Sequence, residues 1–146
     1  MTVVDLNVVL YAINTAAVRH AEARTWWESA LNGDEPVGLT WSVVTGFLRL
    51  STHPSVLPRP LTVEQACQRV NKWLGQPTVR LVRETDEHWR HLEQLLLETG
   101  TGGNLTSDAH LAALAVSHGA TLVSFDHDFA RFANLRWVNP GRQGPQ

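Results

Sequence analysis

The sequence contains a single cysteine, Cys67, a single lysine, Lys72, and no long apolar stretch. One cysteine cannot form a disulfide within the chain, and it excludes a cysteine-rich zinc module. No apolar run approaches the roughly 18 to 20 residues that a membrane-spanning helix requires. The segment from Met1 to Asp5 has neither the basic nor the apolar part of a secretory signal. We therefore expect a cytoplasmic protein with no membrane partner.

Positive charge is not in excess. The 146 residues include 12 Lys and Arg against 14 Asp and Glu, a formal net charge of −2. This balance argues against a protein that holds nucleic acid mainly through a large positive field, but not against one that cuts it. The length suits one domain. We predict that domain over residues 1–140, with a flexible tail at 141–146 that is rich in Gly, Pro and Gln.

Short β-like runs alternate with helical patterns along the chain. We expect strands at 2–5, 37–40, 78–82, 120–125 and 135–138. Helices are expected at 7–13, 17–31, 41–52, 63–74, 86–98 and 106–118, with a short helical turn at 128–132. Such alternation predicts an α/β fold, a mostly parallel sheet of four to five strands with helices on both faces. Ligands of such sheets bind at the carboxyl ends of the strands, near the point where the strand order reverses.

Four of the six aspartates are predicted to meet at that edge. Asp5 ends the first strand, Asp126 ends the fourth, and Asp128 lies two residues further on. Asp108 lies in the first turn of the helix that leads into the fourth strand. Each could alone be a strand end, a helix-start acid or a surface turn. Together, clustered carboxylates repel one another unless a cation joins them, and an all-oxygen site suits Mg²⁺ or Mn²⁺.

Four segments, in their order and spacing, carry a resemblance to a known family. They are Asp5-Leu6-Asn7 followed by Val8–Leu10, then Phe47-Leu48-Arg49, then Asp108–Ala115, then Leu122–Phe129. From Val3 to about Pro140 the chain resembles a PIN domain, in particular the VapC-type toxins of bacterial type II toxin–antitoxin pairs. The resemblance implies a three-layer α/β/α fold and a metal-dependent endoribonuclease that cuts RNA. It also implies a cognate antitoxin that holds the enzyme inactive, and a homodimer.

The resemblance also assigns roles to the aspartates. Asp5, Asp108 and Asp126 would be catalytic metal ligands, and Asp128 would act directly or through water. Asn7 would be the polar neighbour of Asp5.

For two further residues, a role at the site and a purely structural role are equally favoured. Ser124 occupies the position of a small hydroxyl residue near the site, but an ordinary strand residue fits as well. Arg49 could contact a substrate phosphate or an acid, or could form a surface ion pair.

One position departs from the family pattern. The family usually has a glutamate just before the Phe-Leu-Arg segment, and this chain has Gly46. A glycine inside a helix costs about 1 kcal/mol relative to alanine, so it is not there for stability. Neither Ser42 nor Thr45 supplies an acid one turn away. A weaker or single-metal site is our hypothesis, and full loss of catalysis is the alternative.

Two other function classes compete with the nuclease. A relative without the glutamate could bind RNA or an antitoxin without cutting. A metal-dependent phosphotransfer domain is disfavoured, because Asp5-Leu6-Asn7 lacks a second acid and no lysine occurs late in the chain.

Histidines and tryptophans support no second site in the sequence. His88 and His91 could share a metal at i, i+3 spacing, but a solvated face is the favoured interpretation, and His110 and His118 are expected to be peripheral. Core or dimer packing is favoured over base stacking for the tryptophans. They are Trp26, Trp27, Trp41, Trp73, Trp89 and Trp137.

Overall fold

The structure, a computed structural model, describes residues 1–141. The strands of this part are β1 (Thr2–Val4), β2 (Val37–Leu39), β3 (Val79–Leu81), β4 (Thr121–Val123) and β5 (Trp137–Val138). The helices are α1 (Leu6–Ile13), α2 (His20–Leu31), α3 (Trp41–Ser51), α4 (Val63–Leu74), α5 (His88–Thr99) and α6 (Leu105–Ser117), with a 3₁₀ helix η1 (His127–Arg131). Each expected element is present, but the strands are shorter than expected. Apart from Gly141, the expected tail lies outside the described residues.

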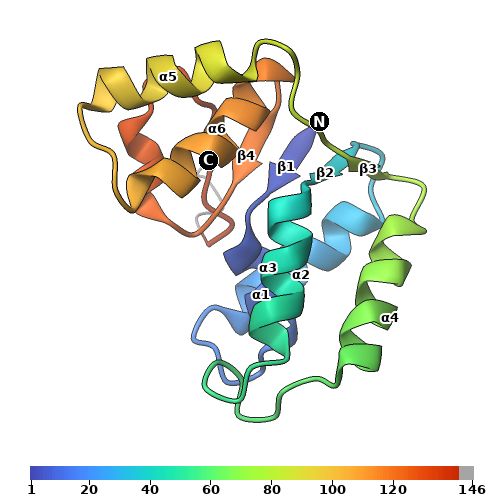
Figure 1. The fold of residues 1–146 in the computed structure, drawn as a ribbon. Coiled ribbons are helices and arrows are strands. Elements are labelled where there is room, and N and C mark those ends of the chain that lie inside the picture. Colours follow the sequence, from blue (N-terminus) through green and yellow to red (C-terminus); the bar gives the residue numbers. More distant parts are fainter. Residues whose placement is uncertain (142–146) are drawn as a thin grey trace.

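The sheet is parallel throughout its described strands, in the order β3-β2-β1-β4-β5. The chain runs outward from β1 to β3 and then returns to the other side of β1 for β4 and β5. With right-handed crossovers, this reversal places the two sets of helices on opposite faces. Figure 1 shows α5 and α6 together on one side and α1 to α4 on the other. The three-layer α/β/α prediction is confirmed, and the order reverses between β1 and β4.

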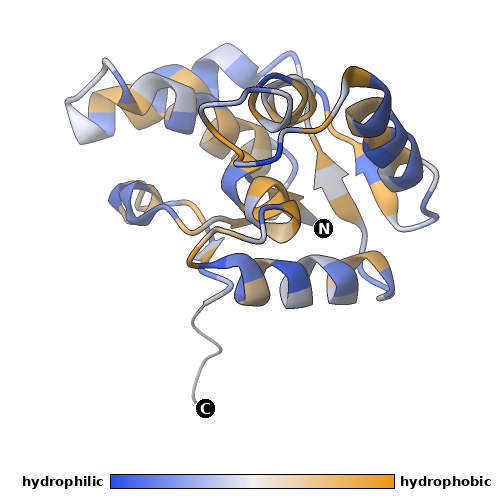
Figure 2. Cartoon of the chain, turned by 90° about the horizontal axis from the view of Figure 1, so that it is seen from below, coloured by the Kyte–Doolittle hydropathy of each residue, from blue (hydrophilic) through white to orange (hydrophobic). Residues whose placement is uncertain are grey.

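The core lies between the sheet and both helix layers. Its largest fully buried apolar side chains include Phe47, Phe129, Leu39, Leu114 and Leu122. Apolar and polar segments alternate along the helices, as expected for elements with one face on the core (Figure 2). No helix within residues 1–141 is long and apolar enough to cross a membrane.

The tryptophans divide between core and surface. The rings of Trp27 and Trp73 are 4% and 6% exposed, with centroids 5.5 Å apart in an edge-to-face arrangement. For these two, core packing is confirmed. Trp41, at the first position of α3, is 52% exposed, and Trp89, on the outer face of α5, is 64% exposed. Core packing is wrong for Trp41 and Trp89, because both are exposed, and dimer packing stays a prediction for them.

Candidate metal centre

Asp5 lies at the reversal point, at the carboxyl end of β1. It is the N-cap of α1, where its Oδ1 accepts a 2.7 Å hydrogen bond from the Leu6 N–H. Its Oδ2 accepts from the Ser124 hydroxyl at 2.7 Å and from Asn7 Nδ2 at 3.2 Å. The carboxylate is therefore held by three donors, two from α1 and one from the residue that follows β4.

Ser124 and Asn7 join the ends of the two central strands. Asn7 Nδ2 also donates to Ser124 Oγ at 3.0 Å, and Asn7 Oδ1 accepts from the Phe125 N–H at 3.2 Å. Ser124 Oγ accepts from the Asp126 N–H at 3.0 Å as well. Since the Ser124 side chain is fully buried and holds both Asp5 and Asp126, it is more than an ordinary strand residue.

Three carboxylates gather beside this network. Asp108, Asp126 and Asp128 each offer one oxygen, and these oxygens lie within 4.8 Å of one another. Asp108 comes from the first turn of α6, which follows Gly103 in a left-handed conformation at φ 58°. Asp126 caps η1, where its Oδ1 accepts from the Asp128 N–H at 2.9 Å. The start of α6 and the segment after β4 therefore bring these three carboxylates together.

The electrostatics of this cluster favour a cation. Burial is the largest cause that raises the pKa of Asp108, followed by the negative charges of Asp126, Asp5 and Asp128, and together they raise it to about 6. Burial also raises the pKa of Asp5, against the lowering effect of its hydrogen bonds from Ser124 and Leu6. Such repulsion is relieved by a divalent ion, and the donors are all oxygens. The residues therefore fit Mg²⁺ or Mn²⁺. Asp5 lies outside the 4.8 Å group, so its role as a ligand stays a prediction.

The raised pKa of Asp108 has a consequence for stability in the absence of metal. Its pKa rises from 3.8 in the unfolded chain to about 6 on folding, so the stabilisation from its proton is complete below about pH 4 and lost as the pH rises through about 6. Asp108→Asn cannot ionise. We expect its Tm to rise relative to the wild type between about pH 4 and about pH 6 and the difference to level off at higher pH, measured by thermal melting in EDTA.

The matched control for this measurement is Asp34→Asn, at an exposed loop position away from the cluster. Its Tm difference from the wild type should stay constant over the same range. A constant difference for Asp108→Asn as well would show that folding does not raise this pKa.

Among residues 1–141, the Arg49 side chain forms no hydrogen bond with the clustered carboxylates. It is exposed on α3, and no ion pair joins it to an acid in the part of the chain described here. The surface-pairing alternative is therefore not observed, and contact with substrate phosphate stays a prediction.

Gly46 is explained by its neighbour on α1. A Cβ atom at this position would lie 2.6 Å from Leu6 Cδ2. Leu6 therefore fills the space in which a longer side chain on α3 would begin. Because Leu6 also lines the cavity that contains Asp5 and Asp108, the missing glutamate is replaced there by an apolar group.

We expect an acid at this position to tighten metal binding. Gly46→Glu combined with Leu6→Ala, which removes the obstructing methyl groups, should bind Mn²⁺ about tenfold more tightly than Leu6→Ala alone, because a further carboxylate faces the ion. Isothermal titration calorimetry measures the difference.

The control is Gly46→Gln in the same Leu6→Ala background, which has the same shape without the charge. If the glutamate and glutamine variants bind Mn²⁺ equally, the hypothesis of a site weakened by glycine fails.

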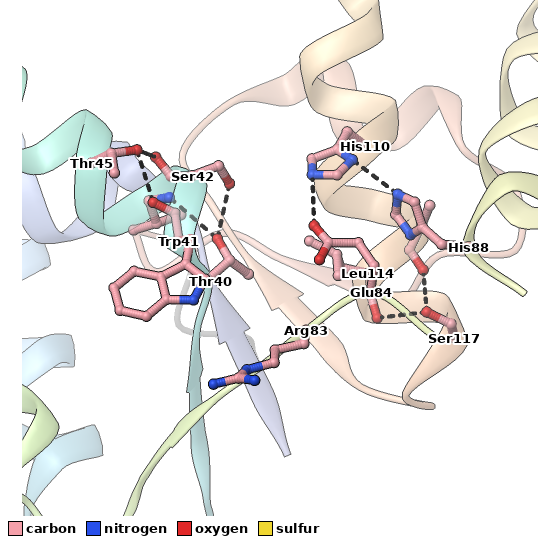
Figure 3. Close-up of polar contacts among 12 residues, drawn as sticks. Thr40, Trp41, Ser42, Thr45, Arg83, Glu84, His88, His110, Leu114 and Ser117 are labelled. Atoms are coloured by element: carbon pink, nitrogen blue, oxygen red, sulfur yellow. Dashed lines mark hydrogen bonds and ion pairs between the residues drawn. The ribbon is translucent and has the colours of Figure 1, made fainter. Parts of the chain in front are cut away.

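A polar cluster that the sequence analysis missed lies next to the carboxylates. His88 Nε2 and His110 Nδ1 are 2.9 Å apart, and His110 Nε2 lies 3.4 Å from Glu84 Oε1 (Figure 3). The solvated-face interpretation of His88 is therefore wrong, because α5 packs on α6 and turns His88 toward His110. His110 is not peripheral, since it lines the same cavity as Asp108. No spacing rule links residues 22 positions apart, so the sequence held no signal for this pair.

Fold and site together define an α/β protein with a cluster of carboxylates at the reversal point of a parallel sheet. The family model of the PIN domain matches residues 2–135. The chain belongs to the PIN domain family.

Relatives in sequence cover nearly the whole chain. Ribonuclease VapC37 of Mycobacterium tuberculosis is 46% identical over 140 residues, which are 96% of this chain and 97% of the relative. Ribonuclease VapC33 of the same species is 40% identical over 143 residues, 98% and 100% of the two chains.

Solved structures share the fold. VapBC2 from Rickettsia felis, bound to a promoter DNA fragment, gives a TM-score of 0.69 at 18% identity over 94% of this chain and 97% of that chain. Mycobacterium tuberculosis VapC20, described as a toxin that cleaves the sarcin–ricin loop, gives 0.67 at 19% identity over 93% and 99%.

Proposed function

We propose that this chain is a metal-dependent endoribonuclease and the toxin of a type II toxin–antitoxin pair. The observation that carries the proposal is the group of three carboxylates from α6 and the loop after β4, set against the Asp5 network at the reversal point. Relatives that are 40% and 46% identical over nearly the full length are named VapC ribonucleases, which supports RNA as the substrate.

The carboxylates would hold Mg²⁺ or Mn²⁺. Asp108, Asp126 and Asp128 supply the grouped oxygens, and Asp5 is the further ligand that the family resemblance implies. When bound, a divalent cation neutralises charge on the phosphodiester and makes water a better nucleophile at neutral pH.

The remaining residues position this centre. Ser124 and Asn7 fix the Asp5 carboxylate, and the Ser124 hydroxyl fixes the backbone at Asp126. Because these bonds form in the folded chain before any substrate arrives, little reorganisation is required when the ion and the RNA bind. The cavity of about 500 Å³ that opens beside Asp5 and Asp108 leaves room for substrate.

An antitoxin is the proposed protein partner, and a homodimer in the cytoplasm is the proposed state of the toxin. A basic side chain of the antitoxin inserted among the carboxylates would replace the charge of the metal and block cleavage. The proposal of an antitoxin partner is supported by the similarity of this fold to the solved structure of VapBC2 from Rickettsia felis.

The decisive test is RNA cleavage by the purified chain. Structured RNA should be cut with Mg²⁺ or Mn²⁺, left intact with EDTA, and cut again when the ion is restored in excess. Cleavage that persists in EDTA contradicts metal dependence. RNA binding without cleavage under all these conditions contradicts the enzyme and supports the non-cutting module suggested by Gly46.

A further inference from the structure

The cavity next to the carboxylates has a composition that metal binding alone does not explain. It measures about 500 Å³ and extends from Asp5 and Asp108 between the start of α3 and α6. Its other lining includes the apolar side chains Val43, Leu92 and Leu111. Volumes of about 300 to 1,000 Å³ with mainly apolar walls and a few polar groups are typical of small-molecule sites. A phosphate would gain nothing from these walls, whereas a flat apolar group would.

His110 lines this cavity and is fixed by its neighbours. Ser42 from α3 and His110 from α6 line the cavity from different elements (Figure 3). The His110 side chain is 34% exposed, and its two ring nitrogens face His88 Nε2 and Glu84 Oε1. Contacts at both nitrogens leave the ring no freedom to turn.

Two contacts hold this pair of rings. One hydrogen bond joins His88 Nε2 and His110 Nδ1 at 2.9 Å. On the other side of the His110 ring, Nε2 faces the Glu84 carboxylate at 3.4 Å. His88 Nδ1 is buried and has no hydrogen-bond partner among residues 1–141. Burial lowers the pKa of His88, and the neighbouring His110 lowers it further, which agrees with a neutral ring.

This arrangement is costly for a purely structural contact. Leaving His88 Nδ1 buried and unpaired opposes folding, and a leucine at either position would fill the space without that cost. The same contacts hold the His110 imidazole in one orientation at the cavity wall. Since both nitrogens are already engaged, the ring offers a ligand its π-surface rather than a hydrogen bond.

We infer that this cavity accepts one unstacked base of the RNA, next to the scissile phosphate, and that His110 is the side chain on which the base stacks. The inference rests on the proposed ribonuclease function. Unpaired bases of RNA loops are commonly splayed out and stacked on aromatic side chains, histidine included. The hydroxyls of Ser42, Thr106 and Ser107 also line the cavity and are available to the base edge or the ribose. His88 and Glu84 act as positioning residues for His110.

The test measures RNA binding in a chain that cannot cut. In the Asp126→Asn background, fluorescence anisotropy compares a single-stranded RNA containing the mapped cleavage site with the same RNA made abasic on either side of that site. His110→Ala should weaken binding of the intact RNA about tenfold, because stacking on one base contributes of that order. One of the abasic RNAs should bind equally to both proteins, since the stacking partner is then already missing.

Matched variants separate stacking from folding. His110→Phe keeps an aromatic face and should retain most of the affinity, whereas His110→Leu should behave like His110→Ala. His88→Ala should give a smaller loss of the same, base-dependent kind. His53→Ala, at an exposed position after α3 and away from this cavity, is the control and should change nothing.

The outcomes distinguish the two proposals. Equal losses on intact and abasic RNA, no loss at all, or equal affinity for the phenylalanine and leucine variants would overturn the base subsite while leaving the ribonuclease intact. If the wild type neither binds nor cuts RNA, the proposed function itself falls. If His110 variants bind RNA normally but lose affinity for the antitoxin, the cavity belongs to the protein partner and the subsite is overturned.

Discussion

Asp126→Asn is expected to lower the rate of RNA cleavage about 1,000-fold, because losing several kcal/mol of transition-state stabilisation costs about a factor of ten per 1.4 kcal/mol. Asp126 is one of three carboxylates whose oxygens lie within 4.8 Å of one another. Asparagine keeps the size of the side chain and can still accept the Asp128 N–H through its oxygen. The fold should therefore survive, and Mn²⁺ affinity should fall together with activity.

Single-turnover cleavage and calorimetric Mn²⁺ titration measure this loss, with Asp34→Asn as the control outside the cluster. Activity within tenfold of the wild type, in a preparation free of other nucleases, would remove Asp126 from the metal centre. A fall in activity with unchanged Mn²⁺ affinity would make it a substrate contact instead.

Asp5→Asn should lower cleavage about 100-fold and also lower the Tm by about 5 °C, since hydrogen bonds to a buried charge contribute about 1.5 to 3 kcal/mol. An asparagine oxygen can still accept from the Leu6 N–H. Its amide nitrogen would then face the donors Ser124 and Asn7, and the buried Ser124 hydroxyl would lose its acceptor. The Asp5 variant differs from the Asp126 variant in this loss of stability.

Thermal melting and cleavage assays on Asp5→Asn and on Ser124→Ala separate the two effects. Ser124→Ala removes the same hydrogen bond but keeps the charge, so it should lower the Tm with a much smaller loss of activity. If both variants lose activity equally, Asp5 acts only as a scaffold and its predicted role as a ligand is wrong.

The local pattern of the sequence was sufficient for the fold and for most of the acidic site. Alternating β-like and helical runs can form a parallel sheet only with helical crossovers, so all strands point to one edge. Asp5 and Asp126, each directly after a strand, had to lie at that edge, and Asp108 at the start of the helix before β4 had to lie there too. Order along the chain therefore determined which carboxylates meet.

Contacts between side chains were beyond the reach of such reasoning. Gly46 was identified as an anomaly, but only packing of α1 on α3 shows that Leu6 fills its space. Core or dimer packing was predicted for Trp89, yet its side chain is 64% exposed, because helical periodicity does not say how wide the buried stripe is.

By itself, the sequence determined the parallel α/β/α architecture, the reversal point and the gathering of acids there, because each follows from periodicity and chain direction. Only the tertiary structure decided that Asp108, Asp126 and Asp128 form the tight group, that Ser124 and Asn7 hold Asp5, and that His88 fixes His110. The physical reason is the range of the interactions. Hydrogen bonds and carboxylate repulsion act over a few ångströms, and helix packing sets those distances between residues far apart in the chain.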